Sequence, residues 1–139
     1  MSIIGSSPAN PPSQLRGLGS LSLFKDLVTQ ALKEIPEEFL ERLENVEIIV
    51  EDEPSSAVLL ELGLEPSDFL FGLYQGVPRA ERHFFEGVIL PDRITLFRQS
   101  FLRSCRSEPE VREQIRKTLV HEIAHHFGFS ENRIRQLGY

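Results

Sequence analysis

The 139-residue sequence lacks several features that define whole classes of protein. It has one cysteine, Cys105, which excludes an intrachain disulfide and favours a reducing compartment, so a cytoplasmic location is expected. No apolar run approaches the roughly 18 residues that a membrane-spanning helix needs, so no membrane association is expected. No positive charge precedes Arg16, and the early residues hold no long apolar run, which argues against a secretory signal.

Positive charge is also scarce. The 15 Lys and Arg residues stand against 21 Asp and Glu residues, which gives a net charge of −6. A chain of this sign repels phosphate backbones, so nucleic acid is not an expected partner. Hydrophobic residues make up 40% and charged residues 26%, as in ordinary globular proteins. The length suits a single domain with one core.

The composition divides the chain into two parts. Residues 1–20 are rich in Pro, Gly and Ser, which disfavour regular hydrogen bonding or add flexibility. We therefore expect a disordered N-terminal tail over residues 1–20 and one domain over residues 21–139.

Hydrophobic periodicity predicts both helices and strands in this domain. Three- and four-residue spacing predicts a helix over residues 21–32, with Ser22 as a possible cap, and Pro36 starts a second, short helix. Alternation and β-branched residues predict strands, and the type of the apolar stretch 57–64 stays open. A short helix or turn is expected from Phe101 to Cys105. The expected strands cover residues 46–50, 69–74 and 94–97, with shorter extended pieces at 82–86 and 88–90.

The last third of the chain gives the strongest signal. Ser107 can cap a helix, and Pro109 suits its first turn. The pattern is helical from residue 111 to 127, where Gly128 ends it. Ser130 begins another helix over residues 131–137.

The long helix carries the string His121-Glu-Ile-Ala-His125. At about 100° per residue, His125 lies about 40° from His121 and one turn along, so both imidazoles can converge on one metal ion. Glu122 lies at about 100°, placed to meet a metal-bound water rather than the metal. An apolar stripe on the opposite face can bury itself and hold the helix rigid. The stripe consists of Ile115, Leu119, Ile123 and Phe127.

A catalytic zinc site usually has three protein ligands, so a third is needed. Gly128 can take a positive φ and turn the chain back, so that Glu131 presents its carboxylate from the next segment. The alternative for Glu131 is an N-terminal helix carboxylate that the helix dipole favours. His126 lies about 140° away on the helical wheel, so we interpret it as a packing or second-shell residue.

The complete string, HExxHxxGxxE, resembles that of the zincin metallopeptidases. The chain is similar to a family of small bacterial zincin-like proteins, the mini-zincins, whose usual string ends in Asp. The similarity covers most of residues 21–139. Beyond the motif it takes in residues 45–50, 73–78, 90–98 and 118–128.

The resemblance implies His121 and His125 as zinc ligands, Glu131 in the place of the third ligand, and Glu122 as general base. Glu131 departs from the usual Asp by one methylene group, which lengthens its reach. Met1 is the sole methionine, so the methionine turn of larger metzincins cannot form. Tyr139 is a candidate to form the base of the site instead, with its ring or hydroxyl, or else it is an ordinary terminal aromatic.

The implied activity is zinc-dependent hydrolysis of peptide bonds, with Glu122 activating a zinc-bound water and a peptide or protein as substrate. Residues 93–98 form either an edge strand to which substrate adds or an internal strand of the sheet. Arg79, Arg82 and His83 either line the entrance of the cleft or belong to a solvated turn.

Two other functions remain open. A zincin scaffold with a weak or empty metal site can serve as a protein-binding module, and a metal-dependent RNA hydrolase is a third possibility that the net charge disfavours. For the fold we expect an α+β, zincin-like architecture. A small mixed sheet of three or four strands should pack against the HExxH helix, with the N-terminal helix alongside and a groove between the sheet edge and the metal helix.

Overall fold

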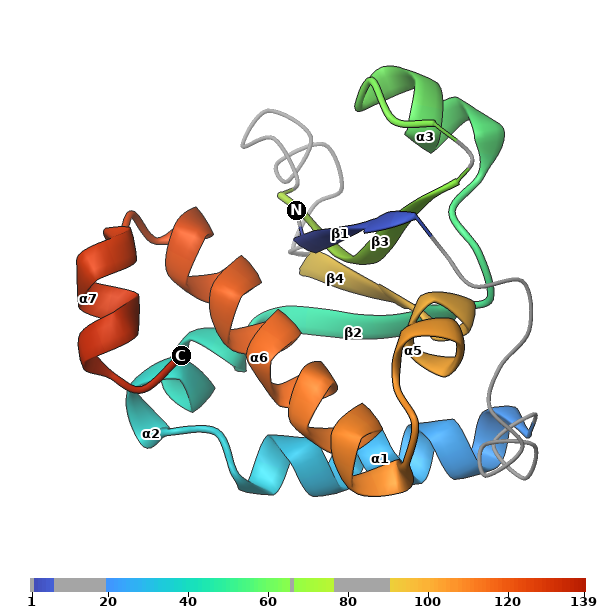
Figure 1. Ribbon diagram of the computed structural model, residues 1–139. Coiled ribbons are helices and arrows are strands. Elements are labelled where there is room, and N and C mark those ends of the chain that lie inside the picture. Colours follow the sequence, from blue (N-terminus) through green and yellow to red (C-terminus); the bar gives the residue numbers. More distant parts are fainter. Residues whose placement is uncertain (1, 7–19, 66, 77–90) are drawn as a thin grey trace, which may run out of the picture.

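The computed structural model describes residues 2–6, 20–65, 67–76 and 91–139, and it has the expected α+β architecture. One four-stranded sheet has the order β1-β3-β4-β2 (Figure 1). The strands are β1 (Ser2–Ser6), β2 (Val46–Glu51), β3 (Asp68–Gln75) and β4 (Asp92–Phe97). The helices are α1 (Leu21–Lys33), α2 (Glu37–Leu40), the 3-10 turn η2 (Glu41–Leu43), α3 (Ser56–Glu61), α5 (Arg98–Ser104), α6 (Glu108–His126) and α7 (Glu131–Gln136).

The sheet is mixed, as predicted. Strands β2 and β4 are parallel, with Ile48 opposite Ile94, whereas β3 runs antiparallel to β4 and to β1. Strand β4 therefore lies between two neighbours in the sheet. The alternative that residues 93–98 offer a free edge to substrate is wrong, because both sides of this strand already pair within the sheet.

The expected disordered tail over residues 1–20 needs a correction at Ser2–Ser6, which form β1. Backbone pairing with β3 gives these residues order that their composition does not predict. Residues 7–19 lie outside the described residues, as do the expected extended pieces at 82–86 and 88–90. The N-terminal cap of α1 is Ser20, whose side chain accepts a hydrogen bond from the Leu23 backbone N–H, rather than Ser22.

The other elements follow the sequence pattern. Strands β2, β3 and β4 contain the predicted segments, and Pro36 occupies the position just before α2. The stretch 57–64, whose type was open, forms α3 and the turn after it. Within the described segments, no helix combines the length and the hydropathy needed to cross a membrane.

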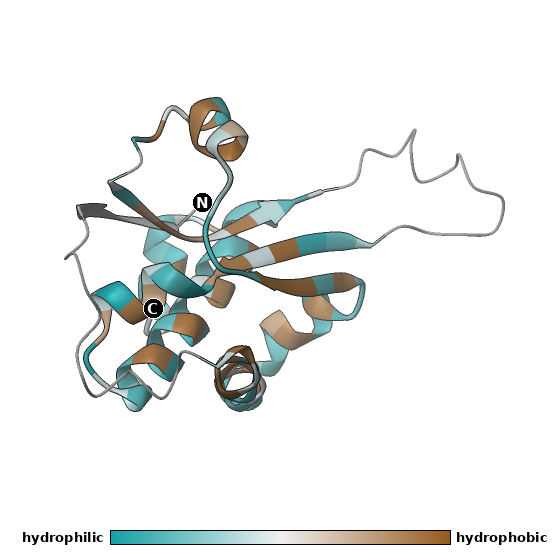
Figure 2. Cartoon of the chain, turned by 90° about the vertical axis from the view of Figure 1, so that its right-hand side faces the viewer, coloured by the Kyte–Doolittle hydropathy of each residue, from teal (hydrophilic) through white to brown (hydrophobic). Residues whose placement is uncertain are grey.

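The core lies between the sheet and the two long helices, α1 and α6 (Figures 1 and 2). Phe101 of α5 joins the layers, since its ring packs 4.9 Å from that of Phe71 and 5.5 Å from that of Phe24, centroid to centroid. The largest fully buried side chains are Phe24, Phe39, Phe71, Phe97, Phe101, Leu70, Ile94, Leu96, Ile115 and Leu119.

Gly72 sets how closely α6 approaches β3. A Cβ at this position would meet the Thr118 methyl group at 2.8 Å and the Thr95 carbonyl oxygen at 3.3 Å. Real Cβ atoms essentially never approach another heavy atom to 2.8 Å, so a larger residue at position 72 would force α6 or its Thr118 side chain to shift. Glycine at position 72 therefore allows α6, which bears the HExxH string, to lie close against β3.

Candidate metal centre

The site begins with a helix whose two ends are both well defined. The Ser107 hydroxyl accepts a hydrogen bond from the Glu110 backbone N–H at the start of α6. At the other end the Phe129 N–H donates to the Ala124 carbonyl and the Gly128 N–H to the His125 carbonyl, with Gly128 at φ +80°. This pairing is a Schellman motif, which turns the chain sharply after α6. The predicted glycine stop is therefore confirmed.

The turn brings Glu131 back to α6, as the sequence predicted. Ser130 caps α7 by accepting from the Arg133 N–H, and Glu131 is the first residue of that helix. His125 Nε2 and Glu131 Oε1 lie 2.6 Å apart in a hydrogen bond. This bond lowers the pKa of the Glu131 carboxyl below its ordinary value. Two of the three predicted ligands are thus in direct contact.

His121 lies one turn earlier on the same helix. Its ring centroid is 5.8 Å from that of His125, with the ring planes nearly perpendicular. Burial, reinforced by the neighbouring His125, lowers the pKa of His121 below its ordinary value. The neutral imidazole is the form that binds a metal ion, so this environment favours the ligand form at neutral pH.

The chemistry of this donor set suits zinc, because two neutral imidazoles and a carboxylate are ligands of catalytic zinc sites. Over the described residues, no three His, Cys, Asp or Glu side chains are already grouped closely enough to hold a metal ion. His125 and Glu131 are instead hydrogen-bonded to each other at 2.6 Å. Two ligand atoms of a tetrahedral zinc ion stand about 3.3 Å apart, so His125 Nε2 and Glu131 Oε1 have to separate before both can bind the same ion.

Glu122 occupies a different environment from the two histidines. Its side chain is 3% exposed, and Oε2 accepts a hydrogen bond from the Tyr74 backbone N–H at 3.3 Å. The sequence placed Glu122 beside the ligand face of the helix, and the structure turns it toward β3. A carboxylate held in this way has little freedom to reorient. Such a fixed orientation is what a positioned general base requires.

Tyr74 is itself held from two sides. Its hydroxyl donates a hydrogen bond to Asp92 Oδ2 at 2.7 Å, and its ring stacks on His126 with a centroid distance of 3.8 Å. His126 Nε2 lies 3.8 Å from the same Asp92 oxygen. His126 therefore packs next to the site, as interpreted from the helical wheel. We name Tyr74, Asp92 and His126 the Tyr74 clamp.

No role near the site was predicted for Tyr74 or Asp92, although both lie in segments that share the family resemblance, residues 73–78 and 90–98. They lie 48 and 30 residues before Glu122, in separate strands, and neither forms a motif with the HExxH string. Only the antiparallel pairing of β3 with β4, which places Gln75 opposite Arg93, brings the two residues together. The available signal is that both are polar residues at strand ends.

Two expectations about the surroundings of the site need comment. Ile115, Leu119 and Ile123 are fully buried as predicted, but Phe127 is 45% exposed. The helix ends before Phe127, and the Phe127 ring lies under the Arg42 guanidinium instead of in the core. Tyr139 accepts a hydrogen bond from Arg116 and packs against Phe39, which is the role of an ordinary terminal aromatic. Arg79, Arg82 and His83 lie outside the described residues.

Comparisons with known proteins identify the family of this chain. A family model described as zincin-like metallopeptidase matches residues 43–139. A solved structure described as a conserved hypothetical protein from Thermo thermophilus is similar, with 28% identity and a TM-score of 0.51. The alignment covers 78% of this chain and 94% of that one. No curated protein matches the chain. Since the family match spans well over half of the sequence and includes the whole HExxHxxGxxE string, the chain belongs to the zincin-like metallopeptidase family.

Proposed function

We propose that this protein is a zinc-dependent metallopeptidase that hydrolyses peptide bonds in a peptide or protein substrate. The observation that carries the proposal is the junction of α6 and α7. There the Gly128 turn brings Glu131 within 2.6 Å of His125, which lies one helical turn from His121 on α6. The buried, single Cys105 suits a cytoplasmic location.

His121, His125 and Glu131 would hold the zinc ion. When bound there, zinc acts as a Lewis acid that lowers the pKa of a water molecule and polarises the substrate carbonyl. For Glu131 to take part, its carboxylate has to exchange its hydrogen bond with His125 for a bond to the metal. The exposure of both side chains permits this exchange without disturbing the core.

Glu122 performs the proton transfers. Its carboxylate accepts a proton from the attacking water and later delivers it to the amine that leaves the cleaved peptide. The hydrogen bond from the Tyr74 N–H fixes Oε2 against β3, so the carboxylate keeps one orientation through both transfers. Within the Tyr74 clamp, Asp92 and His126 hold the side chain of Tyr74 and thereby the position of its backbone N–H.

One observation favours a second function, a protein-binding module built on an inactive zincin scaffold. The described residues contain no ready-made group of three metal-binding side chains, and Glu131 is already bonded to His125. Under this alternative the pair is a structural link between α6 and α7, and zinc binds weakly or not at all.

A zinc titration with a peptide-library cleavage assay distinguishes the metallopeptidase from the protein-binding module. The wild-type protein should bind one zinc ion and cleave peptides. The Glu122→Gln variant should bind zinc equally well and lose turnover, because the amide cannot take up the proton. Full turnover in Glu122→Gln overturns the assignment of the base. Absence of zinc binding and of zinc-induced stabilisation in the wild type favours the binding module.

A further inference from the structure

A cavity of about 500 Å³ lies at the opposite end of β3 from the metal centre. This volume falls within the range of about 300–1,000 Å³ that is typical of ligand-binding pockets. Phe69 lines the cavity, whereas the Tyr74 N–H binds Glu122, and the five residue steps from Phe69 to Tyr74 along the strand span about 17 Å. The cavity is therefore separate from the site already described. Its lining comprises Glu53, Pro54, Ser56, Leu59, Leu60, Leu64, Glu65, Asp68, Phe69, Ser100 and Arg103.

Helix α3 forms one wall of this cavity and is poorly packed. It has six residues, four of them apolar, and none of its residues is buried. Leu60 is 82% exposed. In both views of the chain α3 stands apart from the layer of α1 and α6 (Figures 1 and 2). A helix this short gains little stability by itself, so its apolar side chains favour a partner that covers them.

The charges around the cavity indicate what kind of partner fits. Its lining has three carboxylates against one guanidinium, a net charge of −2. That guanidinium, of Arg103, is already paired with Glu53 at 2.8 Å. Glu65 and Asp68 remain as the excess negative charge, and the Asp68 carboxylate is fixed by a hydrogen bond from the Glu65 N–H. An occupant with a positive charge is therefore favoured over a neutral or an acidic one.

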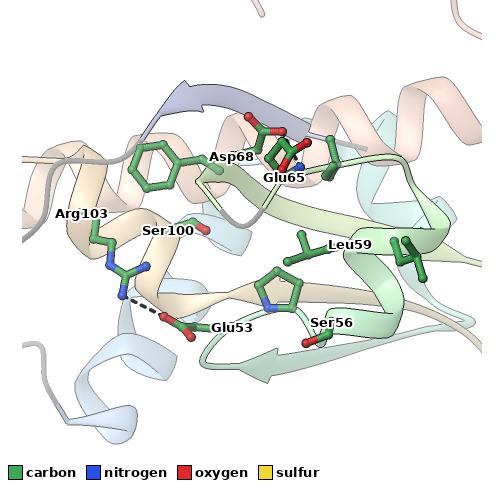
Figure 3. Close-up of a pocket in the computed structure, with 11 residues that line it drawn as sticks. Glu53, Ser56, Leu59, Glu65, Asp68, Ser100 and Arg103 are labelled. Carbon is green, nitrogen blue, oxygen red and sulfur yellow. Dashed lines mark hydrogen bonds and ion pairs between the residues drawn. The ribbon is translucent and has the colours of Figure 1, made fainter.

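The apolar and acidic parts occupy different places in the cavity. Figure 3 shows Glu65 and Asp68 on one side, the Glu53–Arg103 pair on another, and Leu59 pointing in from α3. An occupant must therefore bring an apolar group to Leu59 and Phe69 and a cation to Glu65 and Asp68. Two side chains that branch from one backbone meet both needs.

We propose that this cavity is a second binding site, which takes a short peptide segment with an apolar side chain next to a lysine or arginine. The apolar side chain packs between α3 and Phe69, and the basic group pairs with Glu65 and Asp68. The proposal goes beyond the peptidase activity and does not depend on zinc.

Binding to the full-length, metal-free protein tests this proposal without any cleavage. The probe is acetyl-Leu-Lys-amide, titrated while amide chemical shifts are recorded by NMR. We expect saturable shifts at Leu59, Leu64 and Phe69, with a dissociation constant below about 1 mM. Acetyl-Leu-Glu-amide should bind several-fold more weakly. Equal affinity for the two peptides, or shifts that map to α6 instead, would overturn the proposal.

The double variant Glu65→Gln, Asp68→Asn tests the charge directly. The two changes keep size and polarity, and the amide oxygen introduced by Asp68→Asn can still accept a hydrogen bond from the backbone N–H of residue 65. The variant should bind acetyl-Leu-Lys-amide with an affinity lower by about threefold or more, and it should lose the preference for this peptide over acetyl-Leu-Glu-amide. Glu61→Gln is the matched control, since Glu61 lies on α3 but does not line the cavity, and it should leave affinity unchanged.

A salt titration of the wild type gives an independent readout that needs no variant. Raising sodium chloride from about 50 to about 500 mM should lower the affinity for acetyl-Leu-Lys-amide and leave the affinity for the neutral acetyl-Leu-norleucine-amide almost unchanged. If salt changes the two affinities equally, or the double variant binds as the wild type does, the acidic groups do not recognise the ligand.

Discussion

The backbone N–H of Tyr74 donates a hydrogen bond to the Glu122 carboxylate, and this bond ties helix α6 to the sheet. Tyr74 is held in turn through its side chain, by Asp92 and by the ring of His126. Tyr74 can therefore affect the proposed reaction through the position of the base.

The Tyr74→Phe variant removes the hydroxyl that donates to Asp92 but keeps the ring and the backbone N–H. A hydrogen bond to a charged group contributes roughly 1.5–3 kcal/mol. Because Tyr74 acts on Glu122 only indirectly, part of this energy is lost from the transition state, and we expect kcat to fall by up to about tenfold. KM and zinc affinity should stay the same. Tyr139→Phe is the matched control, since it loses a hydroxyl bonded to Arg116 in a different part of the core. Equal kcat in both variants would show that the clamp does not position Glu122.

The Gly128→Ala variant tests the turn that presents Glu131. Gly128 has φ +80°, and an L-residue there costs about 1 kcal/mol or more in the free energy of unfolding. We expect zinc affinity to fall by about tenfold as well, because the turn orients the third ligand. Gly63→Ala provides a matched control with φ +71° and equally open space, in the turn after α3. It should lose similar stability and keep zinc affinity, and a similar loss of zinc affinity would contradict the account.

Glu131→Ala distinguishes a metal ligand from a helix-capping carboxylate. If Glu131 is the third ligand, zinc affinity measured by competition with a chelator should drop by at least about tenfold. Glu108→Ala is the control, because Glu108 is also the first residue of a helix after a capping serine. Both variants lose the favourable interaction with the helix dipole, but only Glu131→Ala should lose zinc. Unchanged zinc binding would assign Glu131 to the helix alone.

Burial raises the pKa of the Cys105 thiol to about 11. Because the folded pKa exceeds the ordinary value of 9.0, the thiol contributes stability that is fully present below about pH 9 and is lost as the pH rises toward 11. The native protein should therefore react slowly with iodoacetamide near neutral pH and rapidly after unfolding in urea. Mass spectrometry of the labelled protein measures both rates, and equal rates would show that Cys105 is not protected.

Local sequence signals predicted the elements that carry the ligands. Ser107, Gly128 and Ser130 mark helix ends by their own backbone chemistry, so the α6–α7 junction could be predicted without tertiary information. The spacing of His121 and His125 likewise fixes their common face.

Long-range pairing was harder to predict. Strand β1 forms by pairing with β3, and the internal position of β4 depends on β2 lying beside it, neither of which is encoded in a single segment. Phe127 fits the apolar stripe of a continuous helix, but the helix ends one residue earlier. Tyr74 and Asp92 reach the site only through the sheet register.

Anomalous diffraction at the zinc absorption edge, from crystals grown with zinc, tests the central claim most directly. The account predicts one peak within about 2.0–2.2 Å of ring nitrogens of His121 and His125 and of a Glu131 carboxylate oxygen, with Glu122 still bonded to the Tyr74 N–H. Crystals with no zinc peak at the α6–α7 junction, or with Glu131 still hydrogen-bonded to His125 beside a zinc ion held elsewhere, would contradict it.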